Sequence, residues 1–365
     1  MAVQVIAGGT FTKDDGARPG LYVRFIDAAI AAIAVGSRSK VATVKSEWDT
    51  SGGTAENGKV YRIKTMKEAN DLFGSAHTEC IRQIINGGAS EVVVATAVKD
   101  TLNDGEFLWA DTLALLETYT FHVLVPSSCV ADDIQPEMFT FLKSCRTFGK
   151  VFTLVLSART ATDAAGIVSE STTYKDEAVV FVANGVEKAD GTVVTTAEYA
   201  SYIAGLIAGT AIDGSLTFKI VPFANVSKRF SYVDVQTMLA AGLLVTVMDG
   251  DDVKIEQGLT LGDTSNTEFN KIRTVRAKQA IIDDISKAVD DNYVGRVSNN
   301  EDGQIAVINA VKVYLETLAN ANVLANDFTV ELDPNFQSTG EDLYIRVGCR
   351  FIDSIEYVFL TISYS

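Results

Sequence analysis

The stretch Gly53–Val60 is the part of the sequence that comes nearest to a known chemical motif. It reads GTAENGKV and matches the GxxxxGK spacing of a phosphate-binding loop. Such a loop needs Ser or Thr after the lysine to hold Mg²⁺, and it must open a helix so that backbone N–H groups point at the phosphate. Here Val60 follows the lysine, and Lys59–Lys64 alternates like a strand. The pattern therefore favours a glycine-rich hairpin loop over a nucleotide site.

Histidines and paired carboxylates are the other residues that could do chemistry. His77 precedes an expected helix and His122 lies in an apolar strand, and neither has a metal-ligand spacing. The aspartate pairs 283–284 and 290–291 share a helix face, which suits a cation site or an acid–base pair but is more typical of a solvated face. No nucleophile elbow and no dinucleotide-binding glycine pattern is present. We therefore expect no catalytic residue, no cofactor and no metal site.

One basic cluster stands out from a strongly acidic background, because the net charge of the chain is -16. Its members fall close together with no acidic residue between them, and they are Lys271, Arg273, Arg276 and Lys278. On a helix, Arg273 and Arg276 are neighbours at i,i+3. The cluster is either an ordinary solvated face or a docking helix for an acidic partner surface.

Length and composition indicate a folded protein of two or three domains, with 365 residues, 47% hydrophobic and 21% charged. The acidic charge argues against binding to nucleic acid or to anionic membranes. No apolar run approaches the ~18 residues of a membrane helix, and the N-terminus does not read as a signal peptide. Four widely spaced cysteines without a CxxC pattern indicate reduced thiols made in a cytoplasm.

Helices and strands alternate between residues 40 and 265, which predicts an open, mainly parallel α/β sheet. The expected strands are 40–45, 59–64, 91–97, 120–126, 151–157 and 178–183. The expected helices are 66–73, 78–86, 105–118, 133–148, 196–208 and 231–241. Beyond residue 265 the composition changes: a long amphipathic helix or a kinked pair at 268–293 and a second long helix at 304–320 precede a strand at 328–332.

Both ends of the chain contain strands whose partners are not evident. Leu343–Phe351 alternates apolar and polar side chains, whereas Tyr357–Ile362 is apolar on both faces. A loose arm of residues 1–18 precedes the short strand Leu21–Ile26. Because an unpaired edge is a template for another chain, either the same subunit or a neighbour must cover these strands. The side chains expected at such pairing are Leu21, Tyr22, Val23, Phe25, Ile345, Val347, Phe351, Tyr357, Val358, Phe359, Leu360 and Ile362.

Several short motifs, in order along nearly the whole chain, resemble those of the contractile tail sheath proteins of bacteriophages, phage-tail-like bacteriocins and related injection machines. Arg18–Phe25 (RPGLYVRF) resembles the family's N-terminal start, and Thr267–Arg276 (TEFNKIRTVR) resembles the helix that opens its C-terminal domain. Asp291–Gly295 (DNYVG) resembles a helix end, with Arg296 in place of the family's lysine. The helix–strand step through Asp327–Val330 and the tail Ile352–Ile362 complete the match, while residues 100–265 match only as an α/β body.

The resemblance implies a structural subunit without catalysis or cofactor. The implied fold is α/β (α+β overall), with an N-terminal arm and first strand at 1–40, a mixed-sheet outer α/β body at 41–265, and an inner C-terminal α+β domain at 266–365. The extended N- and C-terminal arms would add strands to neighbouring subunits. Subunits would form hexameric rings stacked helically around an inner tube, and contraction would drive that tube through a target cell envelope.

The resemblance also implies the partners, which are further copies of the chain, an inner tail tube protein, and baseplate and tail terminator proteins, with no nucleic acid and no direct membrane insertion. The basic cluster Lys271–Lys278 would rest on the tube. The protein would be made in a bacterial cytoplasm and assembled into a virion tail or a released tail-like particle. Two other functions remain open from the residues: an α/β enzyme of unknown substrate, and a non-contractile filament or surface-layer protein.

Overall fold

The computed structural model describes residues 33–48, 52–99, 106–127, 134–263 and 270–362, together with the backbone of two short strands, β1 (Gln4–Ala7) and β2 (Tyr22–Phe25). The chain forms two compact units. One combines Ser37–Ala280 with Asp353–Ser365, and we call it the α/β unit. The other combines Met1–Gly36 with Ile281–Ile352, and we call it the hairpin unit.

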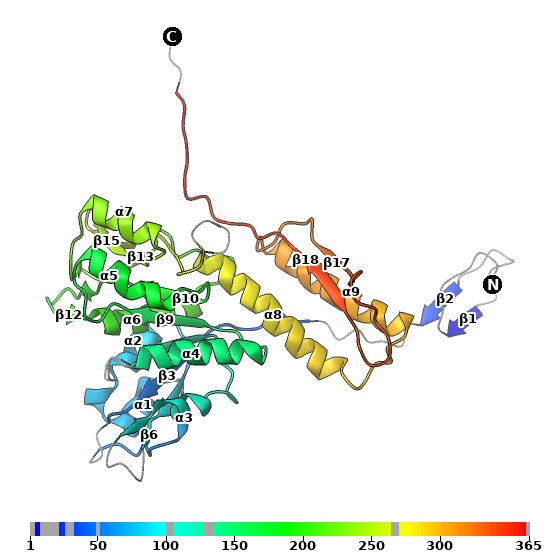
Figure 1. The fold of residues 1–365 in the computed structure, drawn as a ribbon, viewed down its shortest axis with the longest axis horizontal. Helices are drawn as coiled ribbons and strands as arrows, with labels where there is room; N and C mark the ends of the chain where they lie inside the picture. The colour runs from blue at the N-terminus through cyan, green and yellow to red at the C-terminus, as the bar shows by residue number, and fades with distance from the viewer. Residues whose placement is uncertain are drawn as a thin grey trace. The chain divides into compact units, whose positions relative to one another are not determined.

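A six-stranded sheet forms the centre of the α/β unit (Figure 1). Its strand order is β10-β9-β8-β3-β5-β4, in which β4 alone runs antiparallel, against β5. The strands are β3 (Lys40–Lys45), β4 (Val60–Ile63), β5 (Glu91–Thr96), β8 (Val123–Pro126), β9 (Thr153–Ser157) and β10 (Val179–Val182). Every residue of β5, β8, β9 and β10 is buried, because helices cover both faces of the sheet. The predicted open, mainly parallel sheet is confirmed.

Helices on the two faces of this sheet enclose two separate cores. The helices are α1 (Met66–Phe73), α2 (Glu79–Gly87), α3 (Trp109–Ala114), α4 (Ile134–Thr147), α5 (Ala164–Ser171), α6 (Thr196–Gly209) and α7 (Tyr232–Ala240). Successive strand residues point to opposite faces. Val41 of β3 therefore packs in the core that contains α2 and α6, and Ala42 packs in the core that contains α3 and α4.

Short strands complete the α/β unit. They are β6 (Val98–Lys99), β7 (Phe107–Leu108), β11 (Val186–Glu187), β12 (Val193–Val194), β13 (Ile220–Val221), β14 (Asn225–Val226), β15 (Thr246–Asp249) and β16 (Asp252–Ile255). The hairpin expected at Gly53–Val60 is wrong, because β5 lies between β3 and β4 in the sheet. A glycine-rich turn signals a change of direction, but it carries no information about which strand becomes the neighbour.

The hairpin unit contains the second part of α8 (Ile272–Asn292), all of α9 (Glu301–Asn320), and the antiparallel strands β17 (Thr329–Leu332) and β18 (Ile345–Gly348). Asn300 caps α9 by accepting a hydrogen bond from the backbone N–H of Gly303 at 2.9 Å. Of the apolar residues that lie at helical spacing in α9, Val311, Leu315 and Leu318 are buried, whereas Ile308 is half-buried and Ile305 is 45% exposed.

The domain boundaries expected near residues 40 and 265 stay a prediction, because they refer to places in an assembly, whereas the two units are defined by contacts within one chain. Within the described part of the chain, none of the helices combines the length and the apolar character that a bilayer crossing requires.

Candidate functional site

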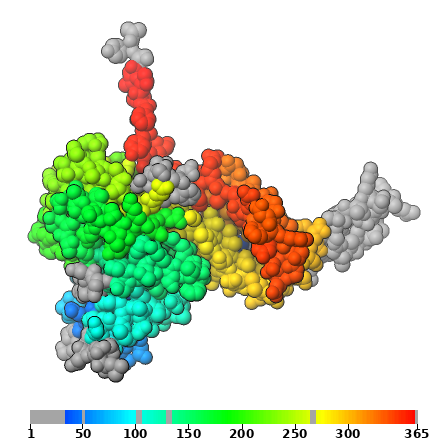
Figure 2. Space-filling model, viewed as in Figure 1, coloured from blue at the N-terminus to red at the C-terminus, as the bar shows by residue number. Residues whose placement is uncertain are grey.

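The C-terminal residues 357–362 form an exposed apolar segment that projects away from the rest of the α/β unit (Figure 2). Val358 is 80% exposed, Phe359 93% and Leu360 78%. The segment was expected to be a strand, yet it pairs with no strand among the described residues. A strand exists only with a partner, so the lone chain leaves it extended and unpaired. The sequence allowed two ways to cover this segment, by the body of the same subunit or by a neighbouring subunit. In the described structure, the body of the same subunit does not cover it.

Strands β17 and β18 form a two-stranded antiparallel sheet that pairs Leu332 with Ile345 and Thr329 with Gly348. Ile345 and Val347 are half-buried on one face, whereas Arg346 is exposed on the other, as the period of two predicts. Each strand has only the other as its neighbour among the described residues, so both outer edges are open to pairing. A sheet of two strands is marginally stable by itself and gains from added strands.

Phe351 lies just beyond β18 and is held within its own unit. Its backbone forms a bridge with Leu324, and the next amide, of Ile352, donates a hydrogen bond to the carbonyl of Val323 at 3.0 Å. The C-terminal region therefore has two parts: residues 345–352 pair inside the hairpin unit, and residues 357–362 pair with no strand of the described structure.

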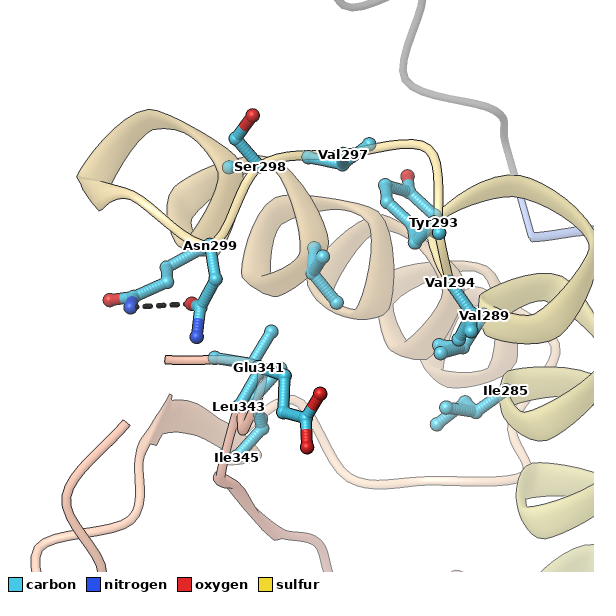
Figure 3. Close-up of a pocket in the computed structure, with 14 residues that line it drawn as sticks. Ile285, Val289, Tyr293, Val294, Val297, Ser298, Asn299, Glu341, Leu343 and Ile345 are labelled. Atoms are coloured by element: carbon cyan, nitrogen blue, oxygen red, sulfur yellow. Dashed lines mark hydrogen bonds between the residues drawn. The ribbon is translucent and has the colours of Figure 1, made fainter. Parts of the chain in front are cut away.

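A cavity of about 470 Å³ lies beside this small sheet, between β18 and the turn that joins α8 to α9 (Figure 3). Ile285 and Val289 of α8 line it from one side, and Leu343 and Ile345 line it from the other. The hydroxyl of Tyr293 is buried in its wall without a hydrogen-bond partner among the described residues, and burial raises the pKa of Tyr293.

The rim of the cavity is held together by the Asn299 side chain. Its amide nitrogen donates to the carbonyls of Gly340 at 3.1 Å and Asp342 at 2.8 Å, and its oxygen accepts from Gln304 at 2.8 Å (Figure 3). These bonds fix the loop that leads into β18 against the start of α9, so the apolar wall formed by Leu343 and Ile345 has a defined position.

At the N-terminus, strand β2 pairs in parallel with β1, with Gln4 opposite Tyr22 and Ala7 opposite Phe25. Tyr22, Val23 and Phe25 thus lie in a strand as predicted, while Leu21 lies outside the described residues. Strand β1 was missed, because the glycine-rich stretch 1–18 was interpreted as a loose arm. The alternation in Val3-Gln4-Val5 was the available signal.

The basic cluster makes contacts inside the α/β unit. The Lys271 ammonium lies 2.8 Å from carboxylate oxygens of both Asp353 and Glu356, and Lys278 donates to Glu177 at 2.7 Å. Arg276 is buried and donates to the backbone carbonyls of Thr210 at 2.6 Å and Ala211 at 3.3 Å. Burial, and then the nearby Arg38, lower the pKa of Arg276 to about 10.

The half-exposed Arg273 lies on α8 with Arg276 and Lys278, whereas Lys271 directly precedes that helix. The docking role expected for the four residues stays a prediction. Asp353 and Glu356 were not singled out from the sequence, because a pairing across some eighty positions leaves no local pattern.

The other residues that could have done chemistry lie in environments that indicate a structural role. Val60 begins β4 rather than a helix, so the Gly53–Val60 loop lacks the helix N-terminus of a phosphate site. Asp284 is buried and accepts from the Tyr314 hydroxyl at 2.8 Å and from the Gly36 backbone at 3.2 Å, so the solvated face expected for it is wrong. Among the described residues, no group of three or more His, Cys, Asp or Glu side chains is arranged to hold a metal ion.

His122, which directly precedes β8, is the histidine next to the sheet for which a catalytic role was an alternative to a packed core position. Burial, and then the positive charges of Arg38, Lys40 and Arg276, lower its pKa to about 3. The imidazole is therefore neutral at physiological pH, and its Nδ1 has no hydrogen-bond partner among the described residues. This environment suits a packed residue rather than a proton shuttle at neutral pH.

Two family models match consecutive parts of the chain: the phage tail sheath protein central domain matches residues 108–261, and the phage tail sheath C-terminal domain matches residues 264–365. The tail sheath protein of Clostridium phage phiCD119 is 25% identical over 251 residues, which cover 67% of this chain and 64% of that protein. The phage-like element PBSX protein XkdK of Bacillus subtilis is 24% identical over 268 residues, covering 70% and 55%. The chain thus spans less than two thirds of the length of these two relatives.

Solved structures match over most of the chain. A sheath tail protein from Desulfitobacterium hafniense has a TM-score of 0.71 at 19% identity, covering 92% of this chain and 98% of its own. The contracted helical sheath of the anti-feeding prophage has a TM-score of 0.73 at 16% identity, covering 96% and 100%. The contracted PVC sheath of an extracellular contractile injection system has 0.73 at 13%, covering 98% and 99%. At these identities the likeness shows a shared fold. The two matching domain models place this chain in the phage tail sheath protein family, a structural family without enzymatic activity.

Proposed function

We propose that this protein is the repeating subunit of a contractile tail sheath, which polymerises helically around an inner tube and contracts to drive that tube through a target cell envelope. The observation that carries the proposal is the exposed apolar segment 357–362, which finds no cover in the described part of its own chain. Contiguous exposed apolar surface of this kind marks a contact with another molecule.

The open edges of β17 and β18 supply the complementary half of such a contact, because a donated strand needs an unpaired edge. About six backbone hydrogen bonds at roughly 1 kcal/mol net each give several kcal/mol for one link. Apolar side chains such as Val358 and Leu360 add about 25 cal/mol for each Å² that they bury. The cavity beside Ile345 offers space for such a side chain.

The N-terminal strand β2 is the second donor. Its described neighbour is β1, so its other edge is open to pairing with a neighbouring subunit. Pairing at both ends would link each copy to two others, and the sheath would be a connected mesh of hexameric rings. The inner C-terminal domain at 266–365 would face the tube, and the α/β body at 41–265 would lie outside.

Contraction follows from the different strengths of these contacts. The arms stay paired while the outer bodies gain buried contact area, which makes the extended sheath metastable. Arg273 and Lys278 are the half-exposed members of the basic cluster, and their contacts with the tube would be salt contacts worth about 0–1 kcal/mol each, so they break first. Lys271 and Arg276 are held inside the α/β unit by carboxylates and backbone carbonyls. The inner tube, baseplate and tail terminator proteins are the proposed partners, in a virion tail or a released tail-like particle.

Charging the exposed segment tests the proposal. In the full-length double variant with Val358→Asp and Leu360→Asp, two carboxylates would enter the apolar contact, so we expect no ordered sheaths by negative-stain microscopy. The thermal midpoint of the isolated subunit should stay within a degree or two, since exposed substitutions change stability by about 0.5 kcal/mol at most.

Phe148→Ser is the matched control, because Phe148 is 81% exposed but lies at the end of α4, away from the chain ends. It should assemble like the unaltered protein. Long striated cylinders formed by the double variant would contradict the proposal, whereas filaments without a hollow core from the unaltered protein would favour a non-contractile filament.

A further inference from the structure

We propose that Lys271 is a positioning residue that anchors the root of the C-terminal segment, Asp353–Tyr357, to the α/β unit and thereby fixes the direction in which residues 358–362 leave it. The proposal rests on the proposed function for the use of that segment by a neighbouring copy, but the anchor itself is a property of one chain.

The anchor is built from one cation and two carboxylates. The Lys271 ammonium lies 2.8 Å from an oxygen of Asp353 and 2.8 Å from an oxygen of Glu356. The side chain of Lys271 is 15% exposed and that of Glu356 only 5% exposed, so the Lys271–Glu356 pair is largely removed from solvent screening. Removing one member of a buried pair leaves the other charge uncompensated, which makes the pair a strong determinant of position.

Hydrogen bonds from uncharged side chains hold the same root. The Thr217 hydroxyl donates to the other oxygen of Glu356 at 2.9 Å and accepts from the Gly258 backbone at 3.1 Å. The Gln257 amide donates to the Tyr357 hydroxyl at 2.6 Å. Residues 217 and 257–258 adjoin β13 and β16, which pair with each other, so the root rests on a framework with its own hydrogen bonds. A groove of about 430 Å³ borders Glu356 and Tyr357 on the side of α7.

The contacts end abruptly along the chain. The root has ion pairs or side-chain hydrogen bonds at residues 353, 356 and 357. From Val358 onward the described residues have no ion pair or side-chain hydrogen bond with the unit. Exposure does not mark this change, because Ile355 inside the root is already 87% exposed and Val358, Phe359, Leu360 and Ile362 are 74% to 93% exposed. The boundary between the anchored root and the segment that is available to a neighbouring copy therefore lies between Tyr357 and Val358.

The lysine itself is well supported. Its backbone forms a bridge with Leu259, and α8 begins at the next residue. Burial alone would lower its pKa, but the ion pairs with Asp353 and Glu356 raise the pKa of Lys271 above its ordinary value, so it stays charged at neutral pH. A group fixed by its own neighbours can hold a mobile segment in one orientation.

The consequence of the anchor is a higher effective concentration of the donated segment at the acceptor edge. A tail that swings freely from residue 353 must lose that freedom when it pairs, and this loss weakens the link. A tail fixed up to Tyr357 has lost most of it beforehand, as in any tethered interaction with a short free linker. Lys271 would then act on assembly without touching the neighbouring copy.

Lys271→Met tests the anchor, because methionine keeps an unbranched apolar stem and removes the charge. In the isolated full-length subunit, chymotrypsin should cut after Phe359 at the same rate in both proteins. Cutting after Tyr357 should be slow in the unaltered protein and roughly tenfold faster in the variant, because a protease needs a locally unfolded segment. Mass spectrometry of the two products gives the ratio, with the Phe359 site as internal reference.

Two further variants complete the design. Lys287→Met removes an exposed lysine from the second part of α8, where its ion pair within the described structure is with Asp291 at 3.5 Å, and it should leave the ratio unchanged. Lys271→Arg keeps the charge and should behave like the unaltered protein. An unchanged ratio in Lys271→Met, or a ratio in Lys271→Arg equal to that of Lys271→Met, overturns the anchor.

Assembly supplies the second measurement. Lys271→Met should raise the protein concentration needed for sheath formation by roughly tenfold, because the freed root lowers the effective concentration of the tail. If the Tyr357 site opens but this concentration does not change, the positioning role is wrong while the proposed function stands. The double variant at Val358 and Leu360 decides the proposed function separately.

Discussion

At the scale of single residues, buried ionisable groups in this protein have structural partners or altered ionisation rather than catalytic geometry. Asp284 accepts two hydrogen bonds inside the hairpin unit, and Arg276 binds two backbone carbonyls inside the α/β unit. His122 is kept neutral by burial and by nearby positive charges. Asp284 and Arg276 therefore hold parts of the fold together, and the neutral imidazole of His122 is not poised to take up a proton at neutral pH.

The lowered pKa of His122 predicts a pH dependence of stability. The unfolded chain binds a proton at His122 below about pH 6.5, whereas the folded chain does so only near pH 3. Folding is therefore favoured above pH 6.5, and this contribution is lost as the pH falls toward the folded pKa. Between pH 7 and pH 5.5 we expect His122 to cost about 1 kcal/mol of the free energy of unfolding.

Urea unfolding of the full-length protein, followed by a signal from the α/β unit, measures the free energy of unfolding at pH 7 and at pH 5.5. The same measurement is made on His122→Asn. The variant removes the titrating group, so its loss of stability between the two pH values should be smaller by that amount. Equal losses in the two proteins would show that His122 titrates alike in the folded and unfolded chains.

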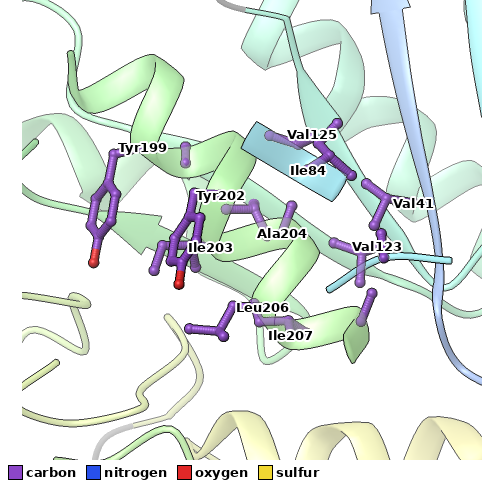
Figure 4. Packing of buried hydrophobic residues seen from close by; sticks show 14 of the residues in the cluster. Val41, Ile84, Val123, Val125, Tyr199, Tyr202, Ile203, Ala204, Leu206 and Ile207 are labelled. Atoms are coloured by element: carbon purple, nitrogen blue, oxygen red, sulfur yellow. The ribbon is translucent and has the colours of Figure 1, made fainter. Parts of the chain in front are cut away.

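At the scale of elements, the close crossing of α2 and α6 supports the sheet face that carries Val41 and Val123 (Figure 4). Glycines make this approach possible. A Cβ on Gly205 of α6 would lie 2.0 Å from the Ile84 carbonyl oxygen, and one on Gly87 of α2 would lie 2.3 Å from that of Tyr202. Two helices at this separation bring backbone against backbone, so the crossing tolerates no side chain at these positions.

Gly205→Ala should therefore force the two helices apart and lower the free energy of unfolding by roughly 2–3 kcal/mol, as overpacking of a core does. Thermal unfolding followed by circular dichroism measures the loss. Gly191→Ala is the comparison, because a Cβ there meets no atom within 4 Å and only the left-handed backbone at φ +82 opposes it, which costs about 1–2 kcal/mol. A smaller loss at Gly205 than at Gly191 would refute the close-packing argument.

Local elements were the part of the fold that the sequence predicted well. Strand β3 has the predicted bounds Lys40–Lys45, and α1 has the predicted bounds Met66–Phe73 because Thr65 and Glu68 form a capping box at its start. Helix α3 is shorter than the predicted 105–118, since Phe107 and Leu108 form a strand instead. Periodicity and caps act over a few residues, which is why they can be seen in the sequence.

Long-range pairings were the part that could not be predicted. The position of β5 between β3 and β4, and the contacts of Lys271 with Asp353 and Glu356, depend on segments far apart in the chain. The tail Tyr357–Ile362 was correctly recognised as needing cover, but its strand conformation was wrong for a single chain because pairing requires a partner. The composition of the tail therefore signalled the candidate site. The geometry of that site could not be predicted from the sequence.

At the scale of the whole molecule, charge opposes assembly and apolar contacts favour it. Each copy carries a net charge of -16, so copies joined by the proposed tail contacts would repel one another. Added salt screens exposed charges within a Debye length, whereas burial of apolar side chains such as Phe359 does not depend on such charges.

Raising the salt concentration from about 50 mM to about 300 mM should therefore lower the protein concentration at which sheaths form. Sedimentation of assembled material across a salt series measures this, with negative-stain images to confirm that the pellet contains sheaths. A steep rise in that concentration with salt would instead mean that attraction between opposite charges, and not apolar pairing, holds the copies together.

The tail that ends beyond Tyr357 and the small sheet of β17 and β18 are unlike each other. A polymer joined tail to sheet is consequently directional: at one extremity it presents spare tails, and at the other it presents vacant edges. The protein that starts such a polymer and the protein that stops it must therefore differ in kind, one offering a receptive sheet and the other a peptide that fills the final edge.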